Sequence, residues 1–231
     1  VEVGVVSDAR TALAALGDAL EERSGSFAVD DDYRREVTQR RQAWEATAYG
    51  RGADGALSLS KAIAAVRAVL PREGIAIASA GHPQIQMFQE FPAYEPRSWM
   101  TPGGYSTMGF TLPAAIGAKL AAPDVPVIGV AGDGDFLMSI QELALVAQLG
   151  LPVVFLVTNS MGWTSIRDFQ RGMFGEDRAF FTDFRDRSGE LISPNFAGVA
   201  REFGIAGERI EDVAELEPAL ERALASGEPA V

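Results

Sequence analysis

Two short polar motifs in the sequence have the residue types of a cation and phosphate site. The motif GDG at residues 132–134 comes directly after the apolar run VPVIGVA, and NSMG at residues 159–162 directly after the apolar run PVVFLVT. A carboxylate, side-chain oxygens and a glycine-flanked carbonyl are suitable ligands for Mg²⁺, which commonly shares its six oxygens between protein and phosphates. The glycines let the backbone approach a phosphate, and a helix expected to begin near Asp135 directs free N–H groups toward it.

The composition narrows the chemistry that these motifs can do. The 231 residues contain no cysteine and one histidine, His82, which excludes disulfides, thiolate sites and His-rich zinc or iron sites. The formal charge of −12 argues against a nucleic acid partner, because phosphate backbones repel an acidic surface. No apolar run of about 18 residues is present, so we expect no transmembrane helix and no membrane partner. A metal here is therefore expected to be a hard, oxygen-ligated cation.

The segments around the motifs have the pattern of a parallel α/β domain. From residue 57 onward, apolar runs such as VPVIGV and PVVFLV alternate with amphipathic helical segments. We expect a doubly wound parallel sheet with helices on both faces, whose ligands sit beyond the carboxyl ends of the strands. One helix, expected over residues 137–150, separates the two motifs. They should therefore be neighbours on one rim of the sheet.

The first 56 residues have a different organisation. Residues 1–22 are predicted to form a strand and a helix, which cannot bury their own apolar face and should belong to a neighbouring domain whose remainder is absent. Residues 23–56 are polar and charged, which predicts a linker with a solvated helix in its middle. Residues 57–231 form the α/β domain. The chain starts without methionine and stops just after a Gly-Glu-Pro turn signal, so we expect a segment of a longer chain whose last strand is cut.

The motifs and the sequence around them resemble a known family. GDG followed after 24 residues by Asn-Ser is similar to the thiamine diphosphate signature, which has a pair of asparagines at this spacing. The stretch from His82 to Gln170, which includes GGYSTMGFTLPAAIGAKLAAP and GDGDFLMSIQELA, resembles the C-terminal diphosphate-binding domain of acetolactate synthase, benzaldehyde lyase and their relatives. Residues 1–22 look like the last strand and helix of that family's middle domain. The resemblance implies the thiamine diphosphate-binding fold.

The resemblance implies a set of metal ligands. Asp133 would ligate Mg²⁺ through its side chain, and Gly162 through its carbonyl oxygen. Ser160 stands where the family has a ligating asparagine. A serine hydroxyl is a shorter and weaker ligand than an amide oxygen, so the resemblance implies either lower metal affinity or a water between Ser160 and the ion.

The resemblance also implies contacts to the cofactor diphosphate. The N–H groups of Gly134 and Asp135 would meet the diphosphate, with Gly132 allowing close approach, and Asn159 would support the loop. His82 falls where relatives place a diphosphate contact; a satisfied structural histidine is the alternative.

Four further residues are implied to lie near the reacting part of the cofactor. Met108 matches the bulky residue that wedges between the two cofactor rings, with core packing as the alternative. The Ser106 carbonyl and the Met108 N–H would hold the pyrimidine edge. Ile166 and Phe169 would face the substrate, and Ile166 replaces the acid of simple decarboxylases, which favours carboligation or lyase chemistry. We expect Trp163 to be half-exposed packing, and residues 171–191 to be either a lid or a surface loop.

The implied function is a thiamine diphosphate- and Mg²⁺-dependent enzyme that decarboxylates a 2-oxo acid such as pyruvate and joins the remainder to a second carbonyl compound. A carbon–carbon lyase, a pyruvate oxidase and a diketone hydrolase of the same superfamily are alternatives. An alternative from another class is a non-catalytic cofactor-binding subunit.

The resemblance also implies partners. The glutamate that activates the cofactor comes from a pyrimidine-binding domain, normally on another subunit, and no segment of this sequence resembles that domain. We therefore expect the segment to be inactive alone and to work in a homodimer or homotetramer. FAD binding stays open, because its site would lie in the middle domain. We expect a cytoplasmic location.

Overall fold

The computed structural model describes residues 3–23, 30–49 and 56–231. The chain divides into two compact units, Val1–Thr47 and Ala48–Val231, which are described separately. Within the described residues, no helix combines the length and the apolar character needed to cross a membrane.

The described residues of the first unit form two helices whose side chains are largely exposed. Helix α1 (Ala9–Glu21) begins after Asp8, which caps it by accepting a hydrogen bond from the Thr11 amide at 3.1 Å. Its leucines form an exposed apolar stripe: Leu13, Leu16 and Leu20. Helix α2 (Asp31–Tyr49) is the solvated helix expected within residues 23–56, and its exposed ion pairs join residues three or four positions apart. Residues 3–7 form no strand, whereas a strand was expected there; residues 1–2 lie outside the described part.

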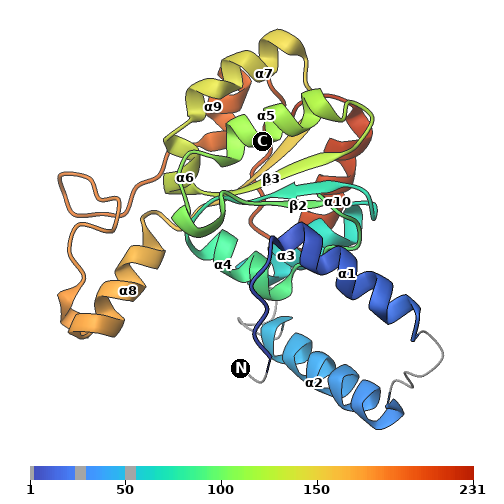
Figure 1. Cartoon of the computed structure of the whole chain (residues 1–231). Helices are drawn as coiled ribbons and strands as arrows, with labels where there is room; N and C mark the ends of the chain where they lie inside the picture. The colour runs from blue at the N-terminus through green and yellow to red at the C-terminus, as the bar shows by residue number, and fades with distance from the viewer. Residues whose placement is uncertain (1–2, 24–29, 50–55) are drawn as a thin grey trace. The chain divides into compact units, whose positions relative to one another are not determined.

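The second unit is built on a parallel four-stranded sheet, as predicted (Figure 1). Its strand order is β2 (Trp99–Met100), β1 (Ile75–Ile77), β3 (Val127–Gly132) and β4 (Val153–Thr158). The short strand expected over residues 205–210 and the cut last strand are reduced to isolated bridges, Ala206 to Ala230 and Val154 to Ala230. These bridges extend the parallel pairing beyond β4.

Helices cover both faces of the sheet, and the residues of β3 alternate between two apolar clusters. Val127 and Ala131 pack with helices α5 (Thr111–Ala121), α6 (Asp133–Leu137), α7 (Leu143–Leu149) and α9 (Phe196–Glu202). Ile128 and Val130 pack with α3 (Leu59–Val69), α4 (Gly81–Glu90) and α10 (Val213–Ser226). This period of two is what a strand buried on both faces requires. The doubly wound arrangement is confirmed.

The segments that follow the strands build one rim of the sheet. The helix expected over residues 137–150 is divided into the end of α6, a 3₁₀ turn η2 (Ile140–Glu142) and α7, and α6 begins at Asp133, two residues earlier than predicted. The glycine-rich loop contains a 3₁₀ turn, η1 (Gly103–Tyr105). After β4 come α8 (Thr164–Phe174) and a third turn, η3 (Glu176–Arg178). Figure 1 shows α8 and the following orange segment projecting away from the sheet.

Candidate functional site

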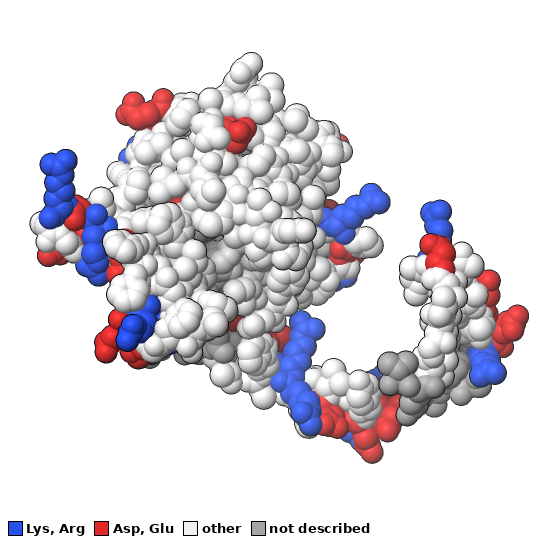
Figure 2. All heavy atoms as spheres, turned by 60° about the vertical axis from the view of Figure 1, so that its left-hand side comes forward, with Lys and Arg blue, Asp and Glu red and all other residues white. Residues whose placement is uncertain are grey.

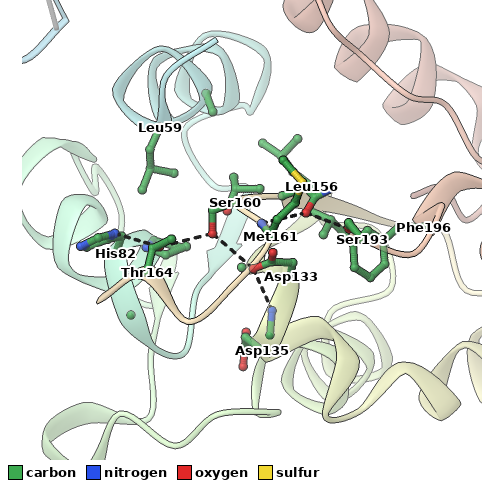
Figure 3. A pocket seen from close by; sticks show the side chains of 18 of the residues that line it. Leu59, His82, Asp133, Asp135, Leu156, Ser160, Met161, Thr164, Ser193 and Phe196 are labelled. Carbon is green, nitrogen blue, oxygen red and sulfur yellow. Dashed lines mark hydrogen bonds between the residues drawn. The ribbon is translucent and has the colours of Figure 1, made fainter. Parts of the chain in front are cut away.

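The predicted residues meet in a cleft of about 1050 Å³ at the carboxyl ends of β3 and β4 (Figure 3). Gly132, the last residue of β3, pairs in register with Thr158, the last residue of β4, so the GDG and NSMG motifs begin side by side. Of the predicted site residues, all but Phe169 line this cleft: His82, Ser106, Met108, Gly132, Asp133, Gly134, Asp135, Asn159, Ser160, Gly162 and Ile166. The parallel register therefore brings together segments that are distant in sequence.

Asp133 is buried and joins the two motifs. Its side chain is 1% exposed. Oδ1 accepts a hydrogen bond from the Gly134 amide at 2.9 Å, and Oδ2 accepts one from the Gly162 amide at 3.0 Å. The Gly134 N–H, which was expected to face a phosphate, donates to Asp133 in this structure. A buried carboxylate is thus fixed at the start of α6 by one amide from each motif.

Three oxygens converge here: one from the Asp133 carboxylate, the Ser160 hydroxyl and the Gly162 carbonyl. The Ser160 Oγ atom lies 3.4 Å from Asp133 Oδ1 and 3.2 Å from the Gly162 carbonyl oxygen. Neighbouring ligands in an octahedral Mg²⁺ shell, each about 2.1 Å from the ion, stand about 3 Å apart. The described residues contain no cluster of three or more His, Cys, Asp or Glu side chains, so a cation here would rely on one carboxylate and neutral oxygens. The donor set fits Mg²⁺, with positions left for phosphate oxygens and water.

Asp135 ties the glycine-rich loop to the GDG turn. Its carboxylate is 3% exposed. Oδ1 accepts from the Gly109 amide at 2.6 Å and Oδ2 from the Thr111 hydroxyl at 2.8 Å. Gly109 has φ +79°, and an added Cβ would lie 3.3 Å from the Met138 Cβ atom, which accounts for a glycine at this turn. The position of the neighbouring Met108 is therefore coupled to the GDG turn.

A second residue, Gln84 of α4, holds the other end of this loop. Gln84 is 3% exposed. Its Nε2 atom donates to the Thr101 hydroxyl at 2.5 Å, and its Oε1 atom accepts from the Ser106 hydroxyl at 2.5 Å. Sequence reasoning missed Gln84, although a polar residue among the apolar positions of α4 was a usable signal.

The loop after β4 is held by side-chain and backbone hydrogen bonds. The Asn159 Oδ1 atom accepts from the Ser193 hydroxyl at 2.9 Å and from the Met161 amide at 3.3 Å. The Met161 carbonyl accepts from the Phe184 amide at 2.9 Å. The Trp163 amide donates to the Thr182 carbonyl at 2.8 Å. Residues 182–184 lie within the long excursion formed by residues 171–191. They therefore form a short backbone strap on the NSMG loop.

Trp163 packs over the GDG turn. Its indole makes an edge-on contact with Phe184, with ring centroids 4.8 Å apart. A Cβ on Gly134 would lie 2.6 Å from the Trp163 Nε1 atom, so the indole covers this glycine directly. The side chain is 40% exposed, which confirms the half-exposed packing predicted for Trp163.

The strap is also held by ion pairs. Asp183 lies between two arginines, with Oδ1 3.1 Å from Arg167 Nη1 and Oδ2 2.9 Å from Arg185 Nη2. The hydrogen bond from Arg185 is the largest cause that lowers the pKa of Asp183, and the bond from Arg167 acts in the same direction. Residues 182–184, in the middle of the segment 171–191, are thus fastened both to α8 and to the NSMG loop.

His82, on α4, lies against α8. Its Nδ1 atom lies 3.4 Å from the Thr164 hydroxyl, and its Nε2 atom lies 3.4 Å from Asp168 Oδ2. The Thr164 hydroxyl in turn lies 3.3 Å from Ser160 Oγ. Sequence reasoning identified neither Thr164 nor Asp168, because neither belongs to a motif.

The predicted substrate residues differ in their surroundings. Ile166 lines the cleft and is 46% exposed, whereas Phe169 lies outside the cleft lining and is 67% exposed. Other large apolar side chains on α8 and beyond it are also exposed: Met173, Phe174, Phe180 and Phe181. Figure 2 shows that charged side chains are sparse over much of the second unit's visible surface.

Known proteins are similar to this chain over the segment that contains the GDG and NSMG motifs. The family described as "Thiamine pyrophosphate enzyme, C-terminal TPP binding domain" matches residues 79–231. The acetolactate synthase large subunit of Parasynechococcus marenigrum is 35% identical over 179 residues, which cover 77% of this chain and 27% of that protein. The chloroplastic acetolactate synthase 2 of Nicotiana tabacum is 31% identical over 226 residues, which cover 96% of this chain and 33% of that protein.

A solved structure is also similar. The Rhodococcus jostii RHA1 thiamine diphosphate-dependent 4-hydroxybenzoylformate decarboxylase superimposes with a TM-score of 0.68 at 26% identity, covering 78% of this chain and 32% of that chain. The chain thus spans about a quarter to a third of the length of the curated relatives named here.

Proposed function

Because the chain belongs to the thiamine pyrophosphate enzymes and contains their C-terminal TPP-binding domain, we propose that it binds the diphosphate and Mg²⁺ of thiamine diphosphate in an acetolactate synthase-like enzyme. The observation that carries this proposal is the convergence of the Asp133 carboxylate, the Ser160 hydroxyl and the Gly162 carbonyl on the rim where β3 and β4 end in register.

The proposed metal ligands are Asp133, Ser160 and Gly162. When bound, thiamine diphosphate supplies the electron sink for breaking a bond beside a carbonyl group. Asp133 provides the one full negative charge in the donor set, and its two amide partners hold it in place. The backbone of Gly132, Gly134 and Asp135 lines the cleft and provides close approach for the diphosphate. Asn159 supports the loop through Met161 and Ser193.

The glycine-rich loop would position the organic part of the cofactor. Met108 is half-buried in the cleft lining, where its side chain would hold the two rings in a bent arrangement. The Ser106 carbonyl and the Met108 N–H would meet the pyrimidine edge. Hydrogen bonds from both sides, through Asp135 and Gln84, support this role because they fix the loop before any ligand arrives.

The substrate side of the proposed site is apolar. Ile166 offers no proton to a substrate carbon, which favours the joining of two carbonyl compounds over simple protonation. Phe169 would contribute to this pocket only after another surface has covered it, because two-thirds of its side chain is exposed. The substrates that we propose are a 2-oxo acid such as pyruvate and a second carbonyl compound.

The relatives are longer than this chain, so we also propose how the chain fits into a larger enzyme. Residues 57–231 would be the TPP-binding domain, residues 23–56 a linker and residues 1–22 the end of a middle domain. The exposed leucine stripe of α1 supports this assignment, because it is an apolar face that the described residues of its own unit leave exposed. A pyrimidine-binding domain of another subunit would complete the cofactor site in a homodimer or homotetramer. FAD binding stays open, and a cytoplasmic location remains a prediction.

The test is carbon–carbon bond formation by the intact protein with thiamine diphosphate, Mg²⁺ and pyruvate, followed by product identification. We expect acetolactate. 4-Hydroxybenzoylformate is the second donor to test, because a structural relative is named as a decarboxylase of that compound; release of its aldehyde would favour decarboxylation. Cofactor binding without turnover of any donor would favour a non-catalytic subunit.

A further inference from the structure

Thr164 lies between two residues of the cleft that are far apart in sequence. It is the first residue of α8 and is half-buried. Its hydroxyl oxygen is 3.3 Å from Ser160 Oγ and 3.4 Å from His82 Nδ1, and the three side chains form a continuous line in Figure 3.

The Ser160 hydroxyl carries one proton and has three acceptors within hydrogen-bond distance. They are the Asp133 carboxylate, the Gly162 carbonyl and the Thr164 hydroxyl. The first two are themselves proposed metal ligands. A proton directed at either of them would occupy the space where a cation requires lone pairs. Of the three acceptors, only Thr164 can take the proton and leave the lone pairs of Ser160 free for a cation. These lone pairs then point to the side where Asp133 and Gly162 lie.

His82 and Asp168 determine the direction of this chain. The Asp168 carboxylate, with Oδ2 3.4 Å from His82 Nε2, favours the tautomer that carries its proton on Nε2. In a neutral imidazole the other nitrogen, Nδ1, is then an acceptor. The Thr164 hydroxyl donates to Nδ1 and is free to accept from Ser160. The donors therefore run from Ser160 to Thr164 to His82, away from the proposed cation position, and Asp168 favours this direction through the His82 tautomer.

We propose that Thr164 is a positioning residue that turns the Ser160 hydroxyl so that its oxygen can ligate Mg²⁺. The proposal rests on the proposed function. It also explains how serine can occupy a metal-ligand position: a side-chain amide has an oxygen without a proton, whereas a hydroxyl needs an acceptor for its proton.

The test compares Thr164→Val with Thr164→Ser, in the native chain and in a Ser160→Asn background. The readout is Mg²⁺ affinity, measured by titrating the intact protein at fixed thiamine diphosphate and following bound cofactor by calorimetry. Loss of a group that orients a metal ligand typically weakens metal binding by about 10-fold or more. We expect about this loss for Thr164→Val and near-native affinity for Thr164→Ser.

The Ser160→Asn background separates ligand orientation from general structure. The amide oxygen of asparagine needs no acceptor, so Thr164→Val should cost little Mg²⁺ affinity there. An equal loss in both backgrounds would overturn the proposal, as would no loss in either. If Thr164→Val fails to fold, Thr164→Ala replaces it, and Asp168→Ala at the exposed end of the chain should show a smaller loss that also disappears in Ser160→Asn.

Asp133→Asn distinguishes failure of this inference from failure of the proposed function. If Asp133→Asn leaves Mg²⁺-dependent cofactor binding unchanged, the site assignment is wrong. If Asp133→Asn removes that binding while Thr164→Val does not alter it, the site stands and Thr164 has no positioning role.

Discussion

The Asp135 carboxylate accepts a hydrogen bond from the Gly109 amide at 2.6 Å, across 26 positions of sequence. This contact fixes the glycine-rich loop to the turn that holds Asp133. It also accounts for an acidic side chain next to a proposed diphosphate site, because both oxygens of Asp135 are occupied by partners from the loop and from α5.

Replacing Asp135 should therefore loosen Met108 as well as destabilise the fold. Asp135→Ala leaves the Gly109 amide and the Thr111 hydroxyl without this acceptor, at a cost of about 1–3 kcal/mol in unfolding free energy. Asp135→Asn keeps an acceptor and should lose less. Denaturant unfolding measures the stability, thiamine diphosphate titration measures the affinity, and Asp177→Ala at an exposed position is the control. Equal losses in the Ala and Asn variants would contradict this reading.

Asp133→Asn should remove most of the Mg²⁺ dependence of cofactor binding. The substitution keeps the shape and one acceptor for the amides of Gly134 and Gly162, but it removes the charge that attracts the cation. We expect cofactor affinity at saturating Mg²⁺ to approach the affinity without Mg²⁺, as measured by calorimetry. An unchanged response to Mg²⁺ would place the metal elsewhere.

Ser160→Asn should maintain or raise Mg²⁺ affinity. The amide oxygen is the stronger ligand, and the open surroundings of Ser160, which is exposed in the cleft, leave room for the larger side chain. The same Mg²⁺ titration provides the measurement. A clear loss of affinity would show that residue 160 does not contact the ion.

Gly162→Ala should destabilise the second unit, whereas Gly117→Ala should not. A Cβ on Gly162 would collide with the Thr182 carbonyl oxygen and lie 3.0 Å from the Asp183 Cα atom, and backbone atoms cannot move aside cheaply. We expect a loss of about 1–3 kcal/mol in unfolding free energy. Gly117, in the exposed part of α5, has nothing within 4 Å of an added Cβ, so alanine should stabilise the helix by up to about 1 kcal/mol.

The attachment of the strap, residues 182–184, should be less stable in acid. Arg185 and Arg167 lower the pKa of Asp183 below its ordinary value of 3.8. A depressed native pKa means that the stabilisation is fully present above the unfolded-state pKa and is lost as pH falls through the native value. Hydrogen exchange at the Phe184 amide should therefore be faster in Asp183→Asn than in the native chain at pH 6. The difference should shrink below about pH 4. A difference that is constant with pH would show that the charge is not responsible.

The sequence was sufficient to predict the parallel sheet and the edge of the sheet that carries the site. Buried parallel strands have an unbroken apolar pattern, and their carboxyl ends share one edge. Asp133, Ser160 and Gly162 could be placed together for this reason. Thr164 and Asp168 could not, because each acts through a contact with a segment whose position depends on packing. The strand expected near the N-terminus is not formed at residues 3–7, since apolar alternation predicts a strand only where another strand supplies hydrogen bonds.

The hydrogen bonds from Phe184 to Met161 and from Trp163 to Thr182 have a kinetic consequence. Residues 182–184 hold the backbone that presents the Gly162 carbonyl, yet they belong to a long surface excursion with several exposed aromatic side chains. Local opening of such segments needs less free energy than global unfolding. The residence time of a bound cofactor should therefore follow how often this strap detaches, and a variant of the excursion could shorten that time without touching a ligand.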